Sequence, residues 1–459
     1  MKRFILRLTG SQHAQLKTHL FPGDGKEAVA LALCGRLHHP EGHTLCVHQI
    51  LLIEHSKCER TPDRVRWDTA HGRQLFERAA AKGMGVLKIH SHPAGYDRFS
   101  EYDDVSDGDL FPSLHSWTDD GMPHASAVML PDGSMFGRFV DSAATFHKMT
   151  HVAVTGDDIA FYRQGGGSTV DAAQMRTSQT FGDKTTVLLK HLRIGIVGCS
   201  GTGGWVIEQL ARLGVGNLLL VDPDIVEFKN LNRIVNSTQD DALQKRAKVA
   251  ALHAAIAKHG TGTEVTVFQD DLFNRKVARA LAECDVLFGC MDSIEGRDIL
   301  NRIAAFYSVP YFDLGVRLDA DGMGGIVNVS GAVHYLLPDG SSLLSRGAYT
   351  AAALRADSLK RTNPSQYKSE LAEGYIKGAK VDSPAVISVN GFCATMAVNE
   401  FLARIHPYRG SDNSECRWQQ FDLVNSCWLQ PKEGVKCLEL SKRAGRGDTT
   451  PFLDCMTYA

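Results

Sequence analysis

The chain has 459 residues, of which 43% are hydrophobic, and its 50 basic and 52 acidic side chains give a formal net charge of −2. This balance offers no electrostatic footprint for nucleic acid or for an anionic membrane surface, and no apolar run approaches the roughly 18–20 residues that span a bilayer. The length exceeds what one hydrophobic core usually serves, and the 11 cysteines form no C-x-x-C pair. We therefore expect a soluble, cytoplasmic protein of two domains with reduced thiols.

The first segment with distinctive chemistry is GVLKIHSHP, residues 85–93, which predicts a strand. On a strand, His90 and His92 project to the same face, and both imidazoles can reach one ion at about 2.0–2.1 Å. Asp103 can supply a third ligand, which leaves the fourth tetrahedral position for water, as in a catalytic zinc site. Ser100 is expected to cap the helix that follows, with Asp103 completing an S-x-x-D capping box. The two roles of Asp103 are compatible.

The whole pattern, H-x-H-P-x(6)-S-x-x-D, resembles the JAMM motif of the JAB/MPN metalloisopeptidases. The resemblance covers roughly residues 1–150 and implies an α-β-α domain, a Zn²⁺ cofactor and cleavage of isopeptide bonds. It also implies an upstream glutamate that binds through or deprotonates the zinc water. The matching stretch places this glutamate at Glu27, with Glu54 in the run QILLIEH as the alternative. By the same match, Ser100 would help to stabilise the oxyanion.

A glycine run flanked by polar residues, Gly165–Gly167 with Ser168, predicts a linker over 161–168. Beyond it, short β-branched runs alternate with amphipathic helical stretches, the pattern of a doubly wound, mostly parallel α/β sheet. Strands are expected at 192–198, 217–224, 264–271 and 284–292, and helices at 205–214 and 245–260.

A glycine turn lies directly between the first of these strands and the first helix. It contains Gly198, Gly201, Gly203 and Gly204, and such glycines let backbone amides approach a phosphate at a helix N-terminus. Asp222 ends the next strand about 20 residues later, where a ribose-binding acid belongs. A nicotinamide-binding domain is the alternative, but the spacing is G-x-x-G-x-G-G and not G-x-G-x-x-G.

The run from Leu220 to Arg233 resembles the D-x-D-x-V-x-x-x-N-L-x-R signature of the ThiF/MoeB/HesA family, the ubiquitin-activating-type adenylyltransferases. The glycine turn and the run 291–297, followed by Asn301, resemble that family too, over roughly residues 170–405. The resemblance implies a Rossmann-like domain that uses ATP and Mg²⁺ to adenylate the C-terminal carboxylate of a ubiquitin-like protein. It assigns Arg233 to the phosphates, Asn230 to their orientation, Asp292 to Mg²⁺ or the adenylate, and Asp222 to the ribose.

A lysine of the second helix also contacts phosphate in this family. The spacing from Arg233 favours Lys248, with Lys245 as the alternative. Arg176 and Gln179 resemble the family's R-x-x-Q segment, whose arginine reaches into the partner subunit's ATP site. That match implies a homodimer.

The segment 334–382 corresponds to the family's crossover segment, which in many relatives carries a transfer cysteine. Here it contains no cysteine, and Ser341, Ser342 and Ser345 stand where cysteines would be expected. Three possibilities remain open: direct transfer of the adenylate, a serine oxyester, or a thioester on a distant cysteine. Cys393 lies in a helical apolar pattern and is expected in the core.

These boundaries give a JAB/MPN-type domain at 1–160, an adenylation domain at 169–410, and a C-terminal extension at 411–459 to which the sequence assigns no role. Such a fusion resembles bacterial ubiquitin-like conjugation systems, because both domains would act on the tail of one modifier. We therefore expect a ubiquitin-like modifier and a ubiquitin-conjugating-type protein as partners. Tail trimming and adenylation of a sulfur-carrier protein is the first alternative, and a binding scaffold is the second.

Overall fold

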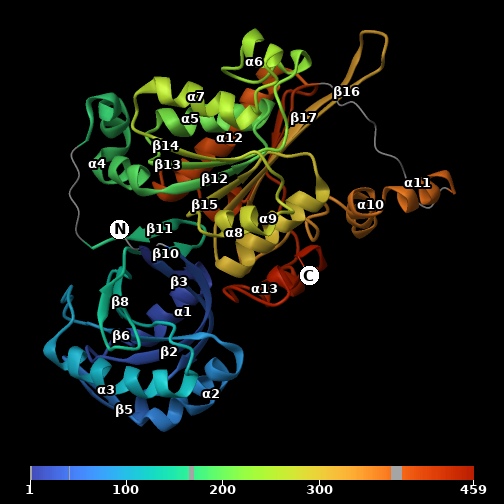
Figure 1. Cartoon of the computed structure of the whole chain (residues 1–459). Coiled ribbons are helices and arrows are strands. Elements are labelled where there is room, and N and C mark those ends of the chain that lie inside the picture. The colour runs from blue at the N-terminus through green and yellow to red at the C-terminus, as the bar shows by residue number, and fades with distance from the viewer. Residues whose placement is uncertain (1–2, 41, 165–169, 374–384, 459) are drawn as a thin grey trace. The chain divides into compact units, whose positions relative to one another are not determined.

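The computed structural model describes residues 3–40, 42–164, 170–373 and 385–458. The predicted linker residues 165–168 and the crossover residues 374–382 lie outside the described residues. The chain divides into two compact units (Figure 1). The first unit comprises Met1–Gly166, Ala305–Ser308 and Lys442–Asp454, and the second comprises Gly167–Ala304, Val309–Ser441 and Cys455–Ala459. The units are discontinuous in sequence, whereas the ranges expected from the sequence are continuous.

Over the described residues, the first unit is built on a mixed sheet with the strand order β11-β10-β1-β3-β2-β6-β7-β8-β9. Its strands are β1 (Arg3–Thr9), β2 (Val29–His39), β3 (Gly42–Leu52), β6 (Gly85–Ser91), β7 (His124–Met129), β8 (Met135–Val140), β9 (Phe146–Lys148), β10 (His151–Thr155) and β11 (Ile159–Tyr162). Strand β6 lies inside this sheet, antiparallel to β2 and parallel to β7. A separate hairpin joins β4 (Cys58–Thr61) to β5 (Arg64–Trp67).

Helices cover both faces of this sheet, which gives the expected α-β-α layers. The helices are α1 (Gly10–Leu20), α2 (Arg73–Lys82) and α3 (Glu101–Thr118). Alternate residues of β6 point to opposite faces: Leu87 and Ile89 pack in one core with α1, whereas Val86 packs in a second core with α2 and α3. The even-numbered residues of β6 therefore face α3.

The segment Lys442–Asp454 completes the first unit from the far end of the chain. Gly35 N–H donates to Gly445 O at 3.0 Å, and Asp448 N–H donates to Arg36 O at 2.8 Å. Gly445 adopts the left-handed region, with φ +68°, and a Cβ on Gly35 would lie 2.1 Å from the backbone of Arg446. Only glycine at position 35 permits this close backbone contact.

Over the described residues, the sheet of the second unit has the order β14-β13-β12-β15-β16-β17-β18-β19. The strands from β14 to β16 are mutually parallel and the remaining pairs are antiparallel. Its strands are β12 (Arg193–Val197), β13 (Asn217–Val221), β14 (Glu264–Phe268), β15 (Val286–Gly289), β16 (Tyr311–Ala320), β17 (Ile326–Leu336), β18 (Trp418–Asp422) and β19 (Cys427–Leu429). The four parallel strands predicted from the sequence are confirmed.

Helices lie on both faces of this second sheet, with α5, α7 and α12 on one face and α8 and α9 on the other (Figure 1). The helices are α4 (Met175–His191), α5 (Gly201–Arg212), α6 (Gln239–Leu243), α7 (Lys248–His259), α8 (Arg275–Ala282), α9 (Ile294–Tyr307), α10 (Ala351–Thr362), α11 (Pro364–Ala372), α12 (Ile387–Ile405) and α13 (Leu438–Ser441). This is the doubly wound arrangement expected from the sequence. It brings the start of α5 to the carboxyl end of β12.

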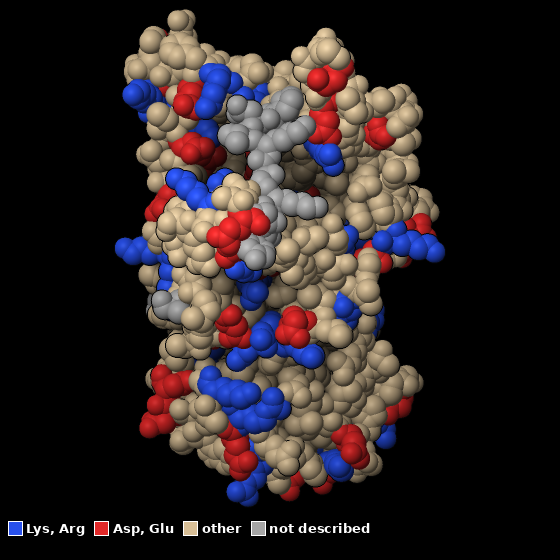
Figure 2. Space-filling model, turned by 90° about the vertical axis from the view of Figure 1, so that its right-hand side faces the viewer, with Lys and Arg blue, Asp and Glu red and all other residues tan. Residues whose placement is uncertain are grey.

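Two surface properties agree with the composition. In the described part of the chain, no helix combines the length and the apolarity needed to cross a membrane. On the face shown in Figure 2, Lys and Arg groups are interspersed with Asp and Glu groups, as the net charge of −2 implies.

Candidate functional site

The first unit brings the three predicted metal ligands together at the end of β6. His90 lies on the strand and pairs in register with Val29 of β2 and Val128 of β7. His92 follows the strand, and Asp103 occupies the first turn of α3. Ser100 caps that helix through the predicted capping box with Asp103. The local strand–loop–helix pattern is therefore the reason that these side chains meet.

The spacing of the donor atoms fits one small cation. Nε2 of His90 lies 3.1 Å from Nε2 of His92 and 2.8 Å from Oδ1 of Asp103, and His92 Nε2 lies 3.4 Å from Asp103 Oδ2. Metal–ligand bonds of 2.0–2.1 Å at tetrahedral angles separate ligand atoms by about 3.3 Å. Within the described residues, this is the one group of His, Cys, Asp and Glu side chains close enough to hold a metal ion.

The contacts around the cluster orient these ligands. His92 Nδ1 lies 2.7 Å from Tyr96 O, and a backbone carbonyl at this nitrogen is the usual arrangement for a histidine that ligates through Nε2. Asp103 Oδ2 accepts from the backbone N–H and the hydroxyl of Ser100, at 2.7 and 2.8 Å. Burial opposes ionisation of Asp103, but its bonds to both histidines hold its pKa well below the usual range. The ligand is therefore a carboxylate, as a metal site requires.

Glu27 lies beside the cluster, whereas Glu54 does not. Glu27 is buried, and its Oε1 is 3.9 Å from His92 Nε2. Its backbone is held by the β4–β5 hairpin, since its N–H donates to Thr61 O and its carbonyl accepts from Arg60. Burial raises the pKa of Glu27 to about 8. Glu54 is exposed and binds the ammonium group of Lys57 at 2.8 Å.

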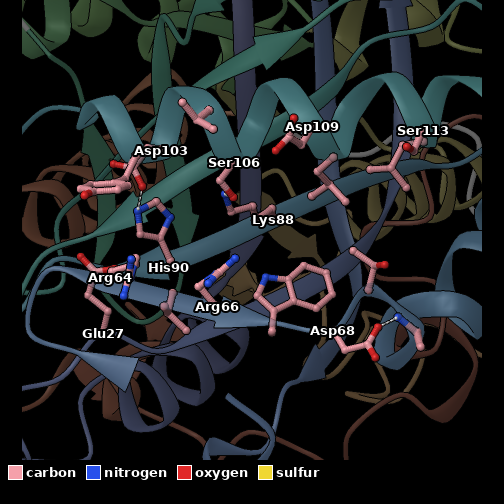
Figure 3. Close-up of a pocket in the computed structure, with 18 of the residues that line it drawn as sticks. Glu27, Arg64, Arg66, Asp68, Lys88, His90, Asp103, Ser106, Asp109 and Ser113 are labelled. Atoms are coloured by element: carbon pink, nitrogen blue, oxygen red, sulfur yellow. Dashed lines mark hydrogen bonds and ion pairs between the residues drawn. The ribbon is translucent and has the colours of Figure 1, made fainter. Parts of the chain in front are cut away.

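A cavity of about 850 Å³ opens from the cluster between α3 and the β4–β5 hairpin. Figure 3 shows His90 and Asp103 facing each other at one end of it, with Glu27 on the other side of His90. Apolar rings line the cavity farther along, including Trp67, Phe76 and Trp117. His90 and Asp103 therefore lie at the end of a cavity with a partly apolar wall.

A buried ionic network holds α3 against the sheet behind the cavity. Asp107, one turn after Asp103, accepts from Lys88 Nζ at 2.7 Å, from Ser126 Oγ at 3.1 Å and from Arg138 Nη2 at 2.7 Å. Arg138 also pairs with Asp104. Lys88, Ser126 and Arg138 lie on β6, β7 and β8, so one carboxylate fixes α3 to three strands. The sequence analysis missed this network.

In the second unit, the glycine turn joins β12 to α5. Gly198 has φ +90°, and a Cβ on it would lie 2.6 Å from Cys290 O. A Cβ on Gly203 would lie 1.8 Å from Gly198 O. The backbone of the turn therefore requires glycine at both positions. The N-terminus of α5 starts at Gly201 and can receive an anion through its free N–H groups.

Asp222 and Lys248 meet at the carboxyl end of β13. Asp222 Oδ2 accepts the Cys199 N–H at 2.7 Å, which ties the acid to the glycine turn. Lys248 is the first residue of α7, and its Nζ lies 2.7 Å from Asp224 and 3.5 Å from Asp222. Lys245 is exposed and precedes the helix. The structure thus brings the favoured lysine, and not the alternative, to the predicted ribose-binding acid.

The other predicted nucleotide residues lie on the loops around this turn. Asn230 is buried and its side chain accepts the Glu227 N–H at 3.0 Å. Arg233 is partly exposed and donates to Lys229 O at 2.8 Å, with its Cδ 3.4 Å from where a Cβ on Gly201 would lie. Asp292 is exposed in the loop between β15 and α9. These groups border the glycine turn without forming a closed cluster.

Arg176 and Gln179 lie on α4, where the arginine donates to the glutamine at 3.3 Å. Both are exposed. The predicted role of Arg176 in a partner's ATP site stays a prediction.

In the described part of the crossover segment, the serines that stand where cysteines were expected form hydrogen bonds. Ser341 Oγ donates to Glu433 at 2.6 Å and accepts from Arg346 at 2.8 Å, and Arg346 also donates to Glu433 at 3.0 Å. Ser342 and Ser345 bond to each other. Cys393 is fully buried, as expected, and burial raises the pKa of its thiol to about 12, so it is a poor nucleophile.

Helix α10 of the same segment contacts the first turn of α9. Asp357 accepts from Ser293 Oγ at 3.1 Å and from Glu295 N–H at 2.9 Å. Arg361 donates twice to Glu295, at 2.7 and 2.8 Å. These bonds hold the turn directly after Asp292. No local sequence signal pairs these two helices.

A parallel sheet with a glycine turn at a helix N-terminus and an acid at the end of the second strand defines a nucleotide-binding α/β protein. Residues 172–437 match the ThiF family. This match covers more than half of the chain, so the protein belongs to the ThiF family. The matched range does not include His90, His92 and Asp103 of the first unit.

Three curated relatives are similar to parts of this chain. The SAMP-activating enzyme E1 of Haloferax volcanii is 31% identical over 148 residues, 32% of this chain and 50% of the relative. The molybdopterin-synthase adenylyltransferase of Escherichia coli is 34% identical over 27% of this chain and 48% of its own length. The sulfur carrier protein ThiS adenylyltransferase of Bacillus subtilis is 28% identical over 27% of this chain and 37% of its own length. The chain thus spans half or less of each of these relatives.

Proposed function

We propose that the second unit uses ATP to adenylate the C-terminal carboxylate of a ubiquitin-like protein. Membership of the ThiF family, together with the glycine turn beside Asp222 and Arg233, is the observation that carries this proposal. The names of the relatives support it, because they state activation or adenylation.

In the proposed reaction, a carboxylate oxygen of the tail attacks the α-phosphorus of ATP. The bond to the bridging oxygen breaks and pyrophosphate leaves, so that an acyl adenylate remains. Two anions must approach each other, so their repulsion has to be offset by fixed positive groups. The α5 N-terminus and Arg233 would hold the phosphates, Asn230 would orient them, Asp222 would bind the ribose and Lys248 would contact phosphate beside it. Asp292 would hold Mg²⁺, which neutralises phosphate charge when bound.

ATP–pyrophosphate exchange tests this proposal directly. The purified full chain should exchange labelled pyrophosphate into ATP only when a ubiquitin-like protein with a free C-terminal tail is present. The same protein with its tail blocked by an amide is the matched control. Reduction of a nicotinamide cofactor without any exchange would contradict the proposal.

We further propose that the first unit is a zinc peptidase that cleaves after the tail of such a modifier. The separations within the His90, His92 and Asp103 cluster support this, as does the resemblance to the JAMM motif. Bound Zn²⁺ would supply a Lewis acid beside the scissile carbonyl. Glu27, with its raised pKa, would take the proton of the attacking water and pass it to the leaving amine. Ser100 would contribute to binding of the oxyanion.

Metal content and hydrolysis test the peptidase separately. The purified protein should contain one zinc ion per chain, and His92→Ala should contain none. His71→Ala, which removes an exposed histidine of the same unit, should keep the metal. Equal zinc in the wild type and His92→Ala would remove the basis for the site.

Together the two activities would expose and activate one tail, in a homodimer that passes the modifier to a ubiquitin-conjugating-type protein. The alternative, supported by the ThiS adenylyltransferase relative, is processing of a sulfur carrier. The end product of the reaction distinguishes conjugation from sulfur-carrier processing. Modifier joined to an amine indicates conjugation, whereas a C-terminal thiocarboxylate indicates sulfur transfer.

A further inference from the structure

Asn390 lies in the first turn of α12 and faces the glycine turn of the nucleotide site. A Cβ on Gly201, the first residue of α5, would lie 2.1 Å from Asn390 Nδ2. The next residue, Gly391, makes a similar approach to Trp205 of α5, with its Cβ position 3.2 Å from the indole ring. Two helices far apart in sequence therefore pack so closely that the amide reaches the start of α5.

The amide of Asn390 is buried but has no protein partner in the described part of the chain. The residue is 6% exposed, and its backbone N–H donates to Val386 O, whereas its side-chain amide makes no hydrogen bond to the described protein residues. Most polar side chains of buried residues in folded proteins are paired, so an amide that makes no bond to protein is available to a ligand. This pattern is typical of a group whose partner is a ligand.

The surroundings of Asn390 select an anion as that ligand. Arg233 reaches the same point, since its Cδ lies 3.4 Å from the Gly201 Cβ position. The free N–H groups of α5 start at this residue and favour negative charge. An amide N–H donor, the Cδ of Arg233 and a helix N-terminus thus lie beside one another at the glycine turn.

We propose that Asn390 is a phosphate ligand of the adenylation site, donating its side-chain N–H to a phosphoryl oxygen of ATP. This rests on the proposed adenylation by the second unit. The neutral amide complements Arg233, because it adds a directed hydrogen bond without a further charge. It also explains why position 201 is glycine, since any side chain there would displace the amide.

Calorimetric titration of ATP–Mg²⁺, AMP and adenosine into the full chain tests this proposal. Asn390→Ala should weaken ATP binding about tenfold or more, because hydrogen bonds to charged groups are worth roughly 1.5–3 kcal/mol. Binding of adenosine, which has no phosphate, should be unchanged. Asn390→Asp keeps the size of the side chain and should weaken ATP binding further, because a carboxylate repels phosphate. Asn399→Ala, an exposed asparagine on the same helix, should bind ATP like the wild type.

The melting temperature of each nucleotide-free variant separates ligand binding from packing. A packing role predicts a lower melting temperature with unchanged nucleotide affinity, and this result would overturn the inference. Equal losses for ATP and adenosine would also overturn it. If Asn390→Ala does not fold, the isosteric Asn390→Asp carries the test. Absence of ATP binding by the wild-type chain would instead contradict the proposed adenylation itself.

Discussion

The cluster of His90, His92 and Asp103 in the first unit and the glycine turn of the second unit are built in opposite ways. His90, His92 and Asp103 are buried and have ligand atoms within 4.8 Å of one another, and the charges behind them are paired through Asp107. Around the glycine turn, in contrast, Arg233 is partly exposed and Asp292 is exposed.

This difference determines which kind of information identifies each site. A preorganised cluster of ligands can be recognised from distances alone, because the protein has already met the energetic cost of bringing the groups together. In a site whose charges lie on separate loops, the bound ligand brings the charged groups together. Such a site is therefore recognised from its sequence pattern and not from distances in the ligand-free structure. The family match includes the glycine turn of the second unit. The cluster of the first unit is identified by the spacing of its ligand atoms.

Replacing Glu27 by glutamine is the sharpest way to separate metal binding from catalysis in the first unit. The change removes a base without removing any of the three ligands, so zinc content should be retained while hydrolysis falls about 10²–10⁴-fold. Zinc analysis and the rate of cleavage of a modifier-tail fusion measure the two effects. Glu54→Gln, at an exposed glutamate, is the matched control and should change neither. Normal hydrolysis by Glu27→Gln would exclude this residue as the base.

Removing Asp107 should break the preorganisation on which the comparison rests. The carboxylate is fully buried and accepts from Lys88 and Arg138, so Asp107→Ala leaves the buried Lys88 without its carboxylate and Arg138 with Asp104 alone. Such losses typically destabilise by about 3–5 kcal/mol. Amide hydrogen exchange in α3 and β6 should accelerate accordingly, while amides of β12 and β13 remain protected. Asp109→Ala, on the exposed side of the same helix, should leave exchange unchanged.

In the second unit, single charge contacts should matter for rate and not for stability. Asp292→Ala or Arg233→Ala should each reduce ATP–pyrophosphate exchange about 10²–10³-fold, as losing one charge contact to the transition state typically does. The melting temperature should stay close to that of the wild type because both side chains are at least partly exposed. Arg317→Ala, at an exposed arginine of β16, is the control. A large loss of stability in Arg233→Ala would erase the contrast between the two sites.

The smallest expected effect concerns the contact between α10 and α9. Asp357→Ala removes an acceptor for two donors at the start of α9, which is comparable to losing a helix cap at about 1 kcal/mol. Hydrogen exchange in the first turn of α9 should rise severalfold, and pyrophosphate exchange should fall by a similar factor. Lys360→Ala, at an exposed position of α10, should have no effect. Unchanged hydrogen exchange in α9 of Asp357→Ala would show that α10 does not stabilise the turn after Asp292.

Features encoded by local pattern could be predicted from the sequence. The strands β6, β12 and β13, the cap at Ser100 and the meeting of His90, His92 and Asp103 all follow from periodicity and spacing within strand–turn–helix segments. The choice of Glu27 came from a motif, and its place beside His92 agrees with that choice.

Features that depend on long-range packing could not be predicted. Asn390 reaches Gly201 only because α12 packs closely on α5, and Asp107 acts through partners on three different strands. No residue pattern near Lys442–Asp454 indicates that this segment belongs to the first unit. In each case the residue or segment can be read from the sequence, but its contact partner is determined by tertiary packing.

Domains generally fold as units in the order in which they emerge from the ribosome. The first unit departs from that order, because β2 awaits the backbone bonds that Gly35 and Arg36 make with Gly445 and Asp448. Those partners emerge only after almost all of the second unit has been translated. Completion of the first unit therefore follows synthesis of most of the second unit, and a nascent chain halted before residue 442 lacks the segment Lys442–Asp454 that bonds to β2.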